Sequence, residues 1–201
     1  MTLEVFIGSA ALAAVSAFLL GFLRHSRYQI VRIVTTGWVE FFRGTSSLVQ
    51  LFWLYFALPF FGVSLSAVQA AIIGLGLVHG AYGSEVVRGA LGSIPREQWE
   101  AATALSMTRR QAFLDVILPQ AFLAMLPPFG NALVLLLKGT SLASIITVPE
   151  LTFQGSVMVT QTLATAPVFT CVLIIYYVLA IGIDRLTRFA EGRLGRWRPQ
   201  V

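Results

Sequence analysis

Apolar residues are concentrated in five segments of the chain, and more polar stretches separate these segments. A bilayer core about 30 Å thick requires about 20 predominantly apolar residues in a helix. The run from Val5 to Leu23 comes close to that length without a single charge. The pattern predicts an all-α membrane protein with about five transmembrane helices, in a single domain that covers residues 1–201. The expected spans are residues 5–23, 48–61, 67–82, 121–137 and 168–183.

The overall composition agrees with this pattern. Of the 201 residues, 57% are hydrophobic and 11% are charged, and the mean hydropathy is +0.80. A water-soluble domain of this size could not bury so much apolar surface. The formal net charge of +5 comes from few charged residues. We therefore expect a lipid bilayer as the environment, and no nucleic-acid partner.

Basic residues cluster in three of the polar stretches, and only Lys138 lies elsewhere. With five spans, these three stretches face the same side, which the positive-inside rule identifies as the cytoplasm. The N-terminus is then expected outside and the C-terminus inside. The first basic cluster follows the first apolar segment, whereas a signal peptide carries its positive charge before it, so this segment is expected to remain as a membrane helix. The clustered residues are Arg24, Arg27, Arg32, Arg43, Arg88, Arg96, Arg109, Arg110, Arg185, Arg188, Arg193, Arg196 and Arg198.

Residues 28–43 form a separate amphipathic element between the first two spans. Apolar residues from Ile30 to Val34 recur at helical spacing, and Trp38 and Phe41 lie among charged residues. This pattern is typical of a helix at a membrane interface. We interpret it as a cytoplasmic elbow that leads into the second span, and as a connector without chemistry of its own.

The stretch from about 93 to 119 predicts a helical hairpin between the third and fourth spans. Ser93 is expected to cap a first helix that has Pro95 in its first turn and extends to about residue 105. A break at 106–107 follows. Thr108 and Gln111 then match a capping box that starts a second helix. By shape alone, docking of a partner protein and a plain connector are equally open.

Residues in this hairpin carry a resemblance to a known family. Glu100-Ala101-Ala102, the turn position at 106, and the run from Val116 to Pro119 match the spacing of the EAA loop of ABC importer permeases. Three longer segments, residues 43–59, 83–102 and 136–151, resemble the polar amino acid permease family in particular. The similarity extends from about residue 2 to 190. The stretch FRGTSSLVQLFWLYFALPFFG is most similar to ectoine and hydroxyectoine permeases.

The resemblance implies a transmembrane permease subunit of an ATP-driven, binding-protein-dependent importer in the bacterial inner membrane. It implies pairing with a second permease subunit, a cytoplasmic ABC ATPase dimer and an extracytoplasmic solute-binding protein. The chain itself would hold no cofactor and catalyse no reaction, since ATP and Mg would bind to the ATPase. The resemblance assigns coupling to the ATPase to Gln98, Trp99, Glu100, Ala101, Ala102, Ser106, Arg109 and Arg110.

The chain departs from the family pattern at two informative positions. Ser106 stands where the family has glycine, and a left-handed turn costs a non-glycine residue about 1–2 kcal/mol. Gly139 stands where an Asp or Asn usually follows the position of Lys138. The chain also starts later than family members usually do, which suggests either a misassigned start codon or a missing lead segment.

The residues alone also indicate that the chain has no ATP-hydrolysing site of its own. No G-x-x-x-x-G-K-[ST] motif occurs, so nucleotide binding by that route is excluded. His25 and His79 are far apart in the sequence and neither belongs to a metal-ligand cluster. A serine protease that uses His79 and Ser84 lacks a nucleophile motif; we expect His79 to hydrogen-bond inside the bundle. Glu85 and Arg88, three residues apart, are expected to form an ion pair.

The solute path is harder to locate from the sequence. Pro127 and Pro128 are expected to interrupt the fourth span and free backbone carbonyls for a ligand, although they could simply kink the helix. Lys138 could contact the solute or snorkel to the headgroups. A stand-alone channel or secondary transporter remains the alternative function, which predicts that no ATPase co-purifies. The candidate path residues are Gln50, Tyr55, Asn131, Lys138, Thr140, Ser141 and Glu150, with Gln161 as a further neutral candidate.

Overall fold

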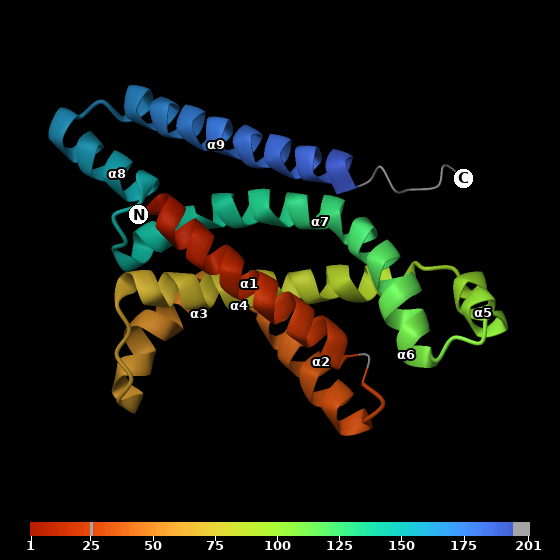
Figure 1. Ribbon diagram of the computed structural model, residues 1–201. Helices are drawn as coiled ribbons and strands as arrows, with labels where there is room; N and C mark the ends of the chain where they lie inside the picture. Colours follow the sequence, from red (N-terminus) through yellow and green to blue (C-terminus); the bar gives the residue numbers. More distant parts are fainter. Residues whose placement is uncertain (25, 195–201) are drawn as a thin grey trace.

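The computed structural model describes residues 1–24 and 26–194, and this part of the chain is helical without a strand (Figure 1). Four helical stretches are long and apolar enough to cross a membrane, and a fifth candidate is a pair of segments bent by 100°. The helices are α1 (Thr2–Leu23), α2 (Gln29–Gly44), α3 (Ser47–Phe52), α4 (Ala67–Gly92), α5 (Arg96–Ala104), α6 (Arg109–Gln111), α7 (Leu118–Gly139), α8 (Leu151–Thr162) and α9 (Thr165–Leu194). Short π-helical turns (Trp53–Ala57, Ala112–Ile117) and 3₁₀ turns (Leu58–Phe61, Thr140–Ile146) extend α3, α6 and α7.

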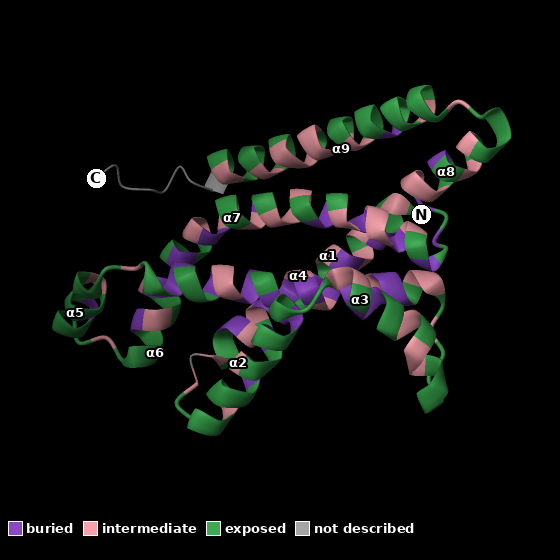
Figure 2. Ribbon diagram, turned by 180° about the vertical axis from the view of Figure 1, so that it is seen from behind, coloured by how far each residue is buried: buried purple, intermediate pink, exposed green. Residues whose placement is uncertain are grey.

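Helix α4 forms the centre of the bundle. Its buried residues appear as purple on the central ribbon of Figure 2, and 61% of its most apolar part is buried. Helix α1 packs along it through small residues. A Cβ added at Gly76 would lie 2.7 Å from Leu12, one at Gly83 would lie 2.7 Å from Ala17, and one at Gly80 would overlap Ser16. Close approach through small residues is how membrane helices associate without a hydrophobic driving force.

The helices extend beyond the apolar spans that the sequence predicts. Helix α4 continues to Gly92, well beyond the expected end of its apolar span at residue 82, and this extension carries the paired charges of Glu85 and Arg88. The fourth span is part of a continuous helical stretch, Arg109–Ile146. The expected interruption at Pro127 and Pro128 is wrong, since α7 runs through both prolines. A transmembrane helix tolerates the lost hydrogen bonds where neighbouring groups satisfy the backbone.

Two further local expectations differ from the structure. Ser93 does not cap α5: its hydroxyl donates to the carbonyl of Ala90, and Pro95 occupies the N-cap position. Helix α8 was not expected at all. It begins at a cap made by the buried carboxylate of Glu150, a side chain whose burial the sequence does not reveal.

The bundle has two distinct ends. The N-terminus lies beside the start of α8, and the described end of α9 lies at the opposite end, on the side of α5 (Figure 1). Helices α1, α4 and α9 therefore run in the same direction along the bundle and α7 runs back. The bent pair of α2 and the Ser47–Phe61 segment completes the connection between α1 and α4.

Candidate functional site

The hairpin between α4 and α7 projects from one end of the bundle (Figure 1). Helix α5 ends in a Schellman motif, in which the N–H of Ser106 donates to Thr103 O at 2.9 Å and the N–H of Met107 donates to Ala102 O at 3.1 Å. This geometry requires a left-handed residue, and Ser106 supplies it with φ = 57°. The sequence prediction of a sharp turn centred on a non-glycine residue is confirmed.

A capping box fixes the second arm of the hairpin. The N–H of Gln111 donates to Thr108 Oγ1 at 3.3 Å, and the N–H of Thr108 donates to Gln111 Oε1 at 2.9 Å. Both bonds satisfy backbone donors that a helix start would leave without partners. The predicted capping box is therefore confirmed. The two arms are held by local hydrogen bonds at their junction.

One side of the hairpin contacts the bundle. The side chain of Ala102 is 2% exposed beneath the turn, and Gln98 accepts a hydrogen bond at 3.2 Å from Nε2 of Gln120 at the start of α7. Trp99 borders two hollows, one shared with Phe113 and Ile117 and the other with Met107 and Arg109. These contacts attach α5 to the stretch that continues into α7.

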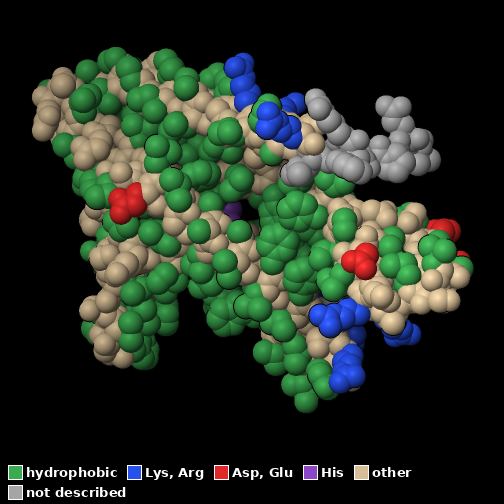
Figure 3. All heavy atoms as spheres, viewed as in Figure 1, with side chains coloured by type: hydrophobic (Ala, Val, Ile, Leu, Met, Phe, Trp, Pro, Cys, Tyr) green, Lys and Arg blue, Asp and Glu red, His purple; other side chains and the backbone are tan. Residues whose placement is uncertain are grey.

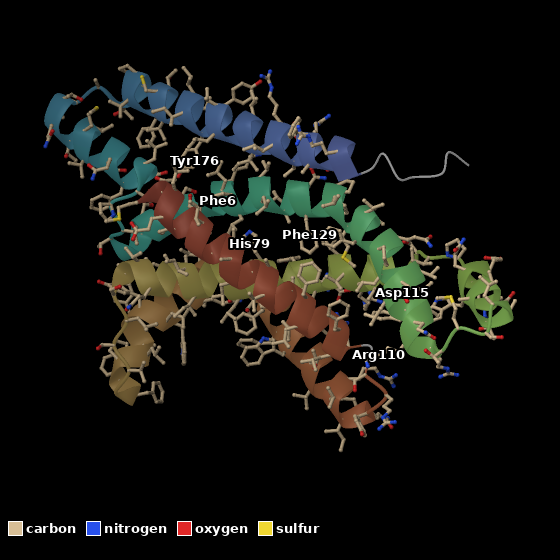
Figure 4. The ribbon with its side chains drawn as sticks, viewed as in Figure 1. Phe6, His79, Arg110, Asp115, Phe129 and Tyr176 are labelled. Atoms are coloured by element: carbon tan, nitrogen blue, oxygen red, sulfur yellow. The ribbon has the colours of Figure 1, made fainter. Side chains whose placement is uncertain are left out.

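The opposite side of the hairpin is exposed. It presents charged and small side chains, with Leu105, 77% exposed, at the tip. Figure 4 shows Arg110 at the tip of the α6 arm, with Asp115 further along the same segment. The exposed residues of the predicted coupling set are Trp99, Glu100, Ala101, Ser106, Arg109 and Arg110, and Trp99 also borders the two hollows. The structure thus divides that set into residues that attach the hairpin and residues that can contact a partner.

An ion cluster joins three helices near the hairpin. Glu85 on α4 accepts from Arg24 Nη1 at 2.6 Å, Arg43 Nη1 at 2.8 Å and Arg88 Nε at 2.7 Å. The predicted Glu85–Arg88 pair is confirmed. The sequence did not reveal the other two arginines, which lie 61 and 42 residues from Glu85. Their only sequence signal is their position at the same expected membrane face.

A groove of about 970 Å³ runs between α7 and α9. Three of the seven predicted path residues, Asn131, Lys138 and Ser141, line it together. Helix α9 contributes Tyr176 and Asp184, which sequence reasoning missed. Their spacing of eight residues, two helical turns, places both on one face of α9 and could have identified them. The groove is apolar overall, with a few polar groups along both walls.

The other predicted path residues lie outside this groove. Glu150, 1% exposed, accepts from the N–H of Phe153 at 2.8 Å and from the Tyr176 hydroxyl at 2.7 Å, so its carboxylate ties α8 to α9. Thr140 is buried and donates to Leu137 O. Gln50 is buried at the α2–α3 bend, where its Nε2 donates to Phe42 O at 3.1 Å. Tyr55 packs against the core beside α4.

His79 makes a contact within its own helix. Its Nδ1 lies 2.9 Å from Leu75 O on α4. The ring faces Gly139 of α7, where an added Cβ would be 3.4 Å from Cε1, and Figure 4 shows it between α4 and α7. Ser84 instead donates to Ala81 O at 2.7 Å. The His79 ring and the Ser84 hydroxyl thus each contact a backbone carbonyl of α4 rather than one another, so the structure does not assemble the pair that protease chemistry would need.

Comparison with known proteins decides the family. The model of the family described as "Binding-protein-dependent transport system inner membrane component" matches residues 7–196. The chain belongs to this family. It is therefore an inner membrane permease subunit of the ABC importer class, and a transport component rather than an enzyme.

Relatives of this permease cover nearly its whole length. It is 40% identical over 98% of its chain to the probable amino-acid ABC transporter permease protein y4tF of Sinorhizobium fredii, 86% of which is covered. It is 34% identical to the L-cystine permease protein TcyB of Bacillus subtilis (98% of this chain, 83% of the relative). It is also 34% identical to the glutamine permease protein GlnP of Escherichia coli K12 (96% and 90%).

Solved structures show the same fold. One described as an amino acid ABC transporter with histidines superposes with a TM-score of 0.91 at 28% identity, and the match covers 96% of this permease and 90% of that chain. An inward-facing MetNI methionine ABC transporter superposes with a TM-score of 0.80 at 21% identity, covering 96% and 92%. The all-helical fold predicted from the sequence is thus confirmed.

Proposed function

We propose that this permease imports a polar amino acid or an amino-acid-derived compatible solute such as ectoine or hydroxyectoine, in a complex driven by ATP. The complex would contain a second permease subunit, identical or similar, an ABC ATPase dimer and an extracytoplasmic solute-binding protein. The observation that carries the proposal is the hairpin: a rigid turn with an exposed Glu100-Ala101 face and an attached Ala102 face. A stand-alone channel or secondary transporter would need no such element, and family membership disfavours it.

The hairpin is built to transmit motion rather than absorb it. Helix α5 follows closely on the end of α4, and the second arm continues without a break in helix into α7. The Gln98–Gln120 bond and the burial of Ala102 fasten α5 to that arm. A displacement of the exposed face would therefore move the ends of two membrane helices together.

The groove between α7 and α9 is our candidate for part of the solute path. Lys138 offers a cation for a carboxylate, and Asn131 and Ser141 offer hydrogen-bonding groups. Asp184 lines the same groove, where its Oδ2 accepts from Arg188 Nε at 2.9 Å and its second oxygen remains an acceptor for the ammonium of a zwitterionic solute. We place Glu150 and Thr140 behind this wall, where Glu150 positions Tyr176. Gln50 and Tyr55 are assigned to the support of the α2–α3 bend rather than to solute contact.

Uptake in cells tests the solute class. Cells that carry the whole operon, with the chromosomal copy deleted, would be offered labelled ectoine, glutamine, arginine, cystine and glycine betaine separately. We expect saturable uptake of one of the amino acids or of ectoine, and a loss of about tenfold or more in Lys138→Gln, because a charge-assisted hydrogen bond is worth about 1.5–3 kcal/mol. The matched control is Arg185→Gln on α9, which also removes one positive charge but at an exposed position that does not line the groove. Uptake of glycine betaine alone would contradict the proposed solute class. Equal uptake by wild type and Lys138→Gln would contradict the proposed path.

The orientation is a second part of the proposal. We infer that the N-terminus faces outward and that the hairpin and C-terminus face the cytoplasm. Arg24, Arg43 and Arg88 come together at one end of the bundle, as the positive-inside rule requires. Reporter fusions after residue 105 and after residue 163 should show cytoplasmic and external signals, respectively. The reverse pattern would overturn the orientation.

A further inference from the structure

A basic pocket of about 510 Å³ lies where the ends of α1, α2 and α4 converge. It is separate from the groove between α7 and α9 and from the exposed face of the hairpin. Its lining residues are Arg24, Ser26, Arg32, Thr36, Arg88 and Gly92. We propose that this pocket binds the phosphate of an anionic phospholipid headgroup, such as that of phosphatidylglycerol or cardiolipin.

The charge balance of the pocket favours an anion. Among the described residues, Glu85 is the one carboxylate that forms ion pairs with Arg24 and Arg88 of the pocket. Glu85 also forms an ion pair with Arg43. Arg24 and Arg43 each contact it through Nη1 and Arg88 through Nε. A guanidinium carries five N–H donors. The cluster therefore keeps donors for a second anion after Glu85 is satisfied, and Arg32 adds a further cation to the lining.

The side chains of α2 show why the anion should belong to a lipid. One face of the helix, with Thr35, Val39 and Phe42, is buried. A second face is apolar yet 59–77% exposed at its most open positions, which are Ile30, Ile33, Val34 and Phe41. An exposed apolar helix face beside a polar stripe is the pattern of a helix that lies in the membrane interface.

Two residues of the polar stripe between those two faces line the pocket. Arg32 and Thr36 are four residues apart, so they lie one above the other on α2, with Ile33 beside them. Glu40 continues the same stripe one turn further on, outside the lining of the pocket. A phosphate at the Arg32 end would thus sit beside apolar side chains that can contact acyl chains. Inorganic phosphate has no acyl chain, so contact with these apolar side chains would not stabilise its binding.

The position along the bundle agrees with a headgroup. The pocket is formed by residues that follow the end of α1, the last turns of α4 and the first turns of α2. Figure 3 shows Lys and Arg side chains gathered beside the lower end of α2. Basic pockets between membrane helices at such an end bind anionic headgroups. A bound lipid would hold the elbow against α4 immediately before the chain enters α5.

Native mass spectrometry of the full chain, purified within its transporter complex, tests the proposal. The complex would be delipidated, then titrated separately with phosphatidylglycerol, phosphatidylcholine and inorganic phosphate. Arg32→Gln removes one pocket charge without touching the Glu85 cluster, and Thr36→Glu places a negative charge in the pocket. The matched control is Arg185→Gln, because Arg185 is an exposed arginine on α9 that does not line the pocket. Elution profile and melting temperature without lipid confirm that each variant is folded.

We expect wild-type protein and Arg185→Gln to retain phosphatidylglycerol over phosphatidylcholine. Retention should fall about fivefold in Arg32→Gln, because one basic residue near an anionic surface is worth about that factor, and further in Thr36→Glu. Equal retention in all variants, or equal binding of phosphatidylcholine, would overturn the proposal. Competition by millimolar inorganic phosphate would also overturn it, by showing a site for a free anion.

Discussion

At the scale of single residues, Ser106 sets the geometry of the hairpin. It is one of three non-glycine residues with positive φ among the described residues, with Thr147 and Leu163. The Schellman motif satisfies the last carbonyls of α5 at the cost of that conformation. The hydrogen bonds on both sides of the turn offset the conformational strain at Ser106. They hold the tip of the hairpin in an exposed position.

Substitution of Ser106 separates the backbone requirement from the side chain. Ser106→Gly should preserve uptake and leave the melting temperature equal or higher, because glycine adopts positive φ without steric cost. Ser106→Val should lower stability by about 1–2 kcal/mol, because a β-branched residue fits the left-handed region poorly. Thermal unfolding and uptake measured on the same preparations check both. Loss of uptake in Ser106→Gly would mean that the hydroxyl has a role of its own.

Tyr176 gives a second prediction at this scale. Its hydroxyl donates to Glu150, whose carboxylate is otherwise buried. Tyr176→Phe should destabilise the protein by about 1–3 kcal/mol, because a buried acceptor loses its donor. Tyr177→Phe is the matched control, since Tyr177 is its neighbour on α9 and 64% exposed. Equal melting temperatures for the two variants would show that the bond does not hold α8 against α9.

At the scale of the elements, the packing of α1 on α4 depends on the absence of side chains. Gly76, Gly80 and Gly83 recur at intervals of four and three along one face of α4. An added Cβ at each would collide with a residue of α1. By contrast, a Cβ at Gly89 of the same helix would meet nothing within 4 Å.

Two valine substitutions in α4 test this packing. Gly80→Val should force α1 away from α4 and lower both the amount in the membrane and the melting temperature, at a cost of about 1–3 kcal/mol or more, as overpacking does. Gly89→Val introduces the same side chain into the same helix where there is room, and should remain close to wild type. If both variants behave alike, close contact between α1 and α4 does not stabilise the bundle.

The sequence predicted elements better than the contacts between them. Hydropathy located the apolar spans, and local motifs located the capping box and the turn at Ser106, because these depend on neighbouring residues. The ion cluster joins Arg24 to Glu85 across 61 residues, and nothing local encodes that meeting. The same holds for Glu150, which the sequence offered as a candidate path residue and whose carboxylate is buried as a helix cap. The prolines of α7 misled because neighbouring helices can compensate a break that an isolated helix would suffer.

At the scale of the whole molecule, the two ends of the bundle are built differently. One end gathers the hairpin, the Glu85 cluster and the basic pocket, all within reach of the ends of α1, α2 and α4. The other end joins α8, α9 and the start of α1, where Thr2 Oγ1 accepts from the N–H of Leu151 at 2.9 Å. The groove between α7 and α9 lies between these ends. This arrangement suits a permease that receives force at one end and passes a solute along its length.

The central claim is that force enters through the exposed face of the hairpin. The most direct measurement is ATP-driven uptake of the identified solute into proteoliposomes that contain the complete complex, with the binding protein supplied. Wild type would be compared with Glu100→Lys and with Glu40→Lys, a charge reversal at an exposed position on α2. We predict that uptake is lost in Glu100→Lys and kept in Glu40→Lys, with equal amounts of permease in the membrane. Uptake by Glu100→Lys at the wild-type rate would contradict the account, because transport would then not depend on this face.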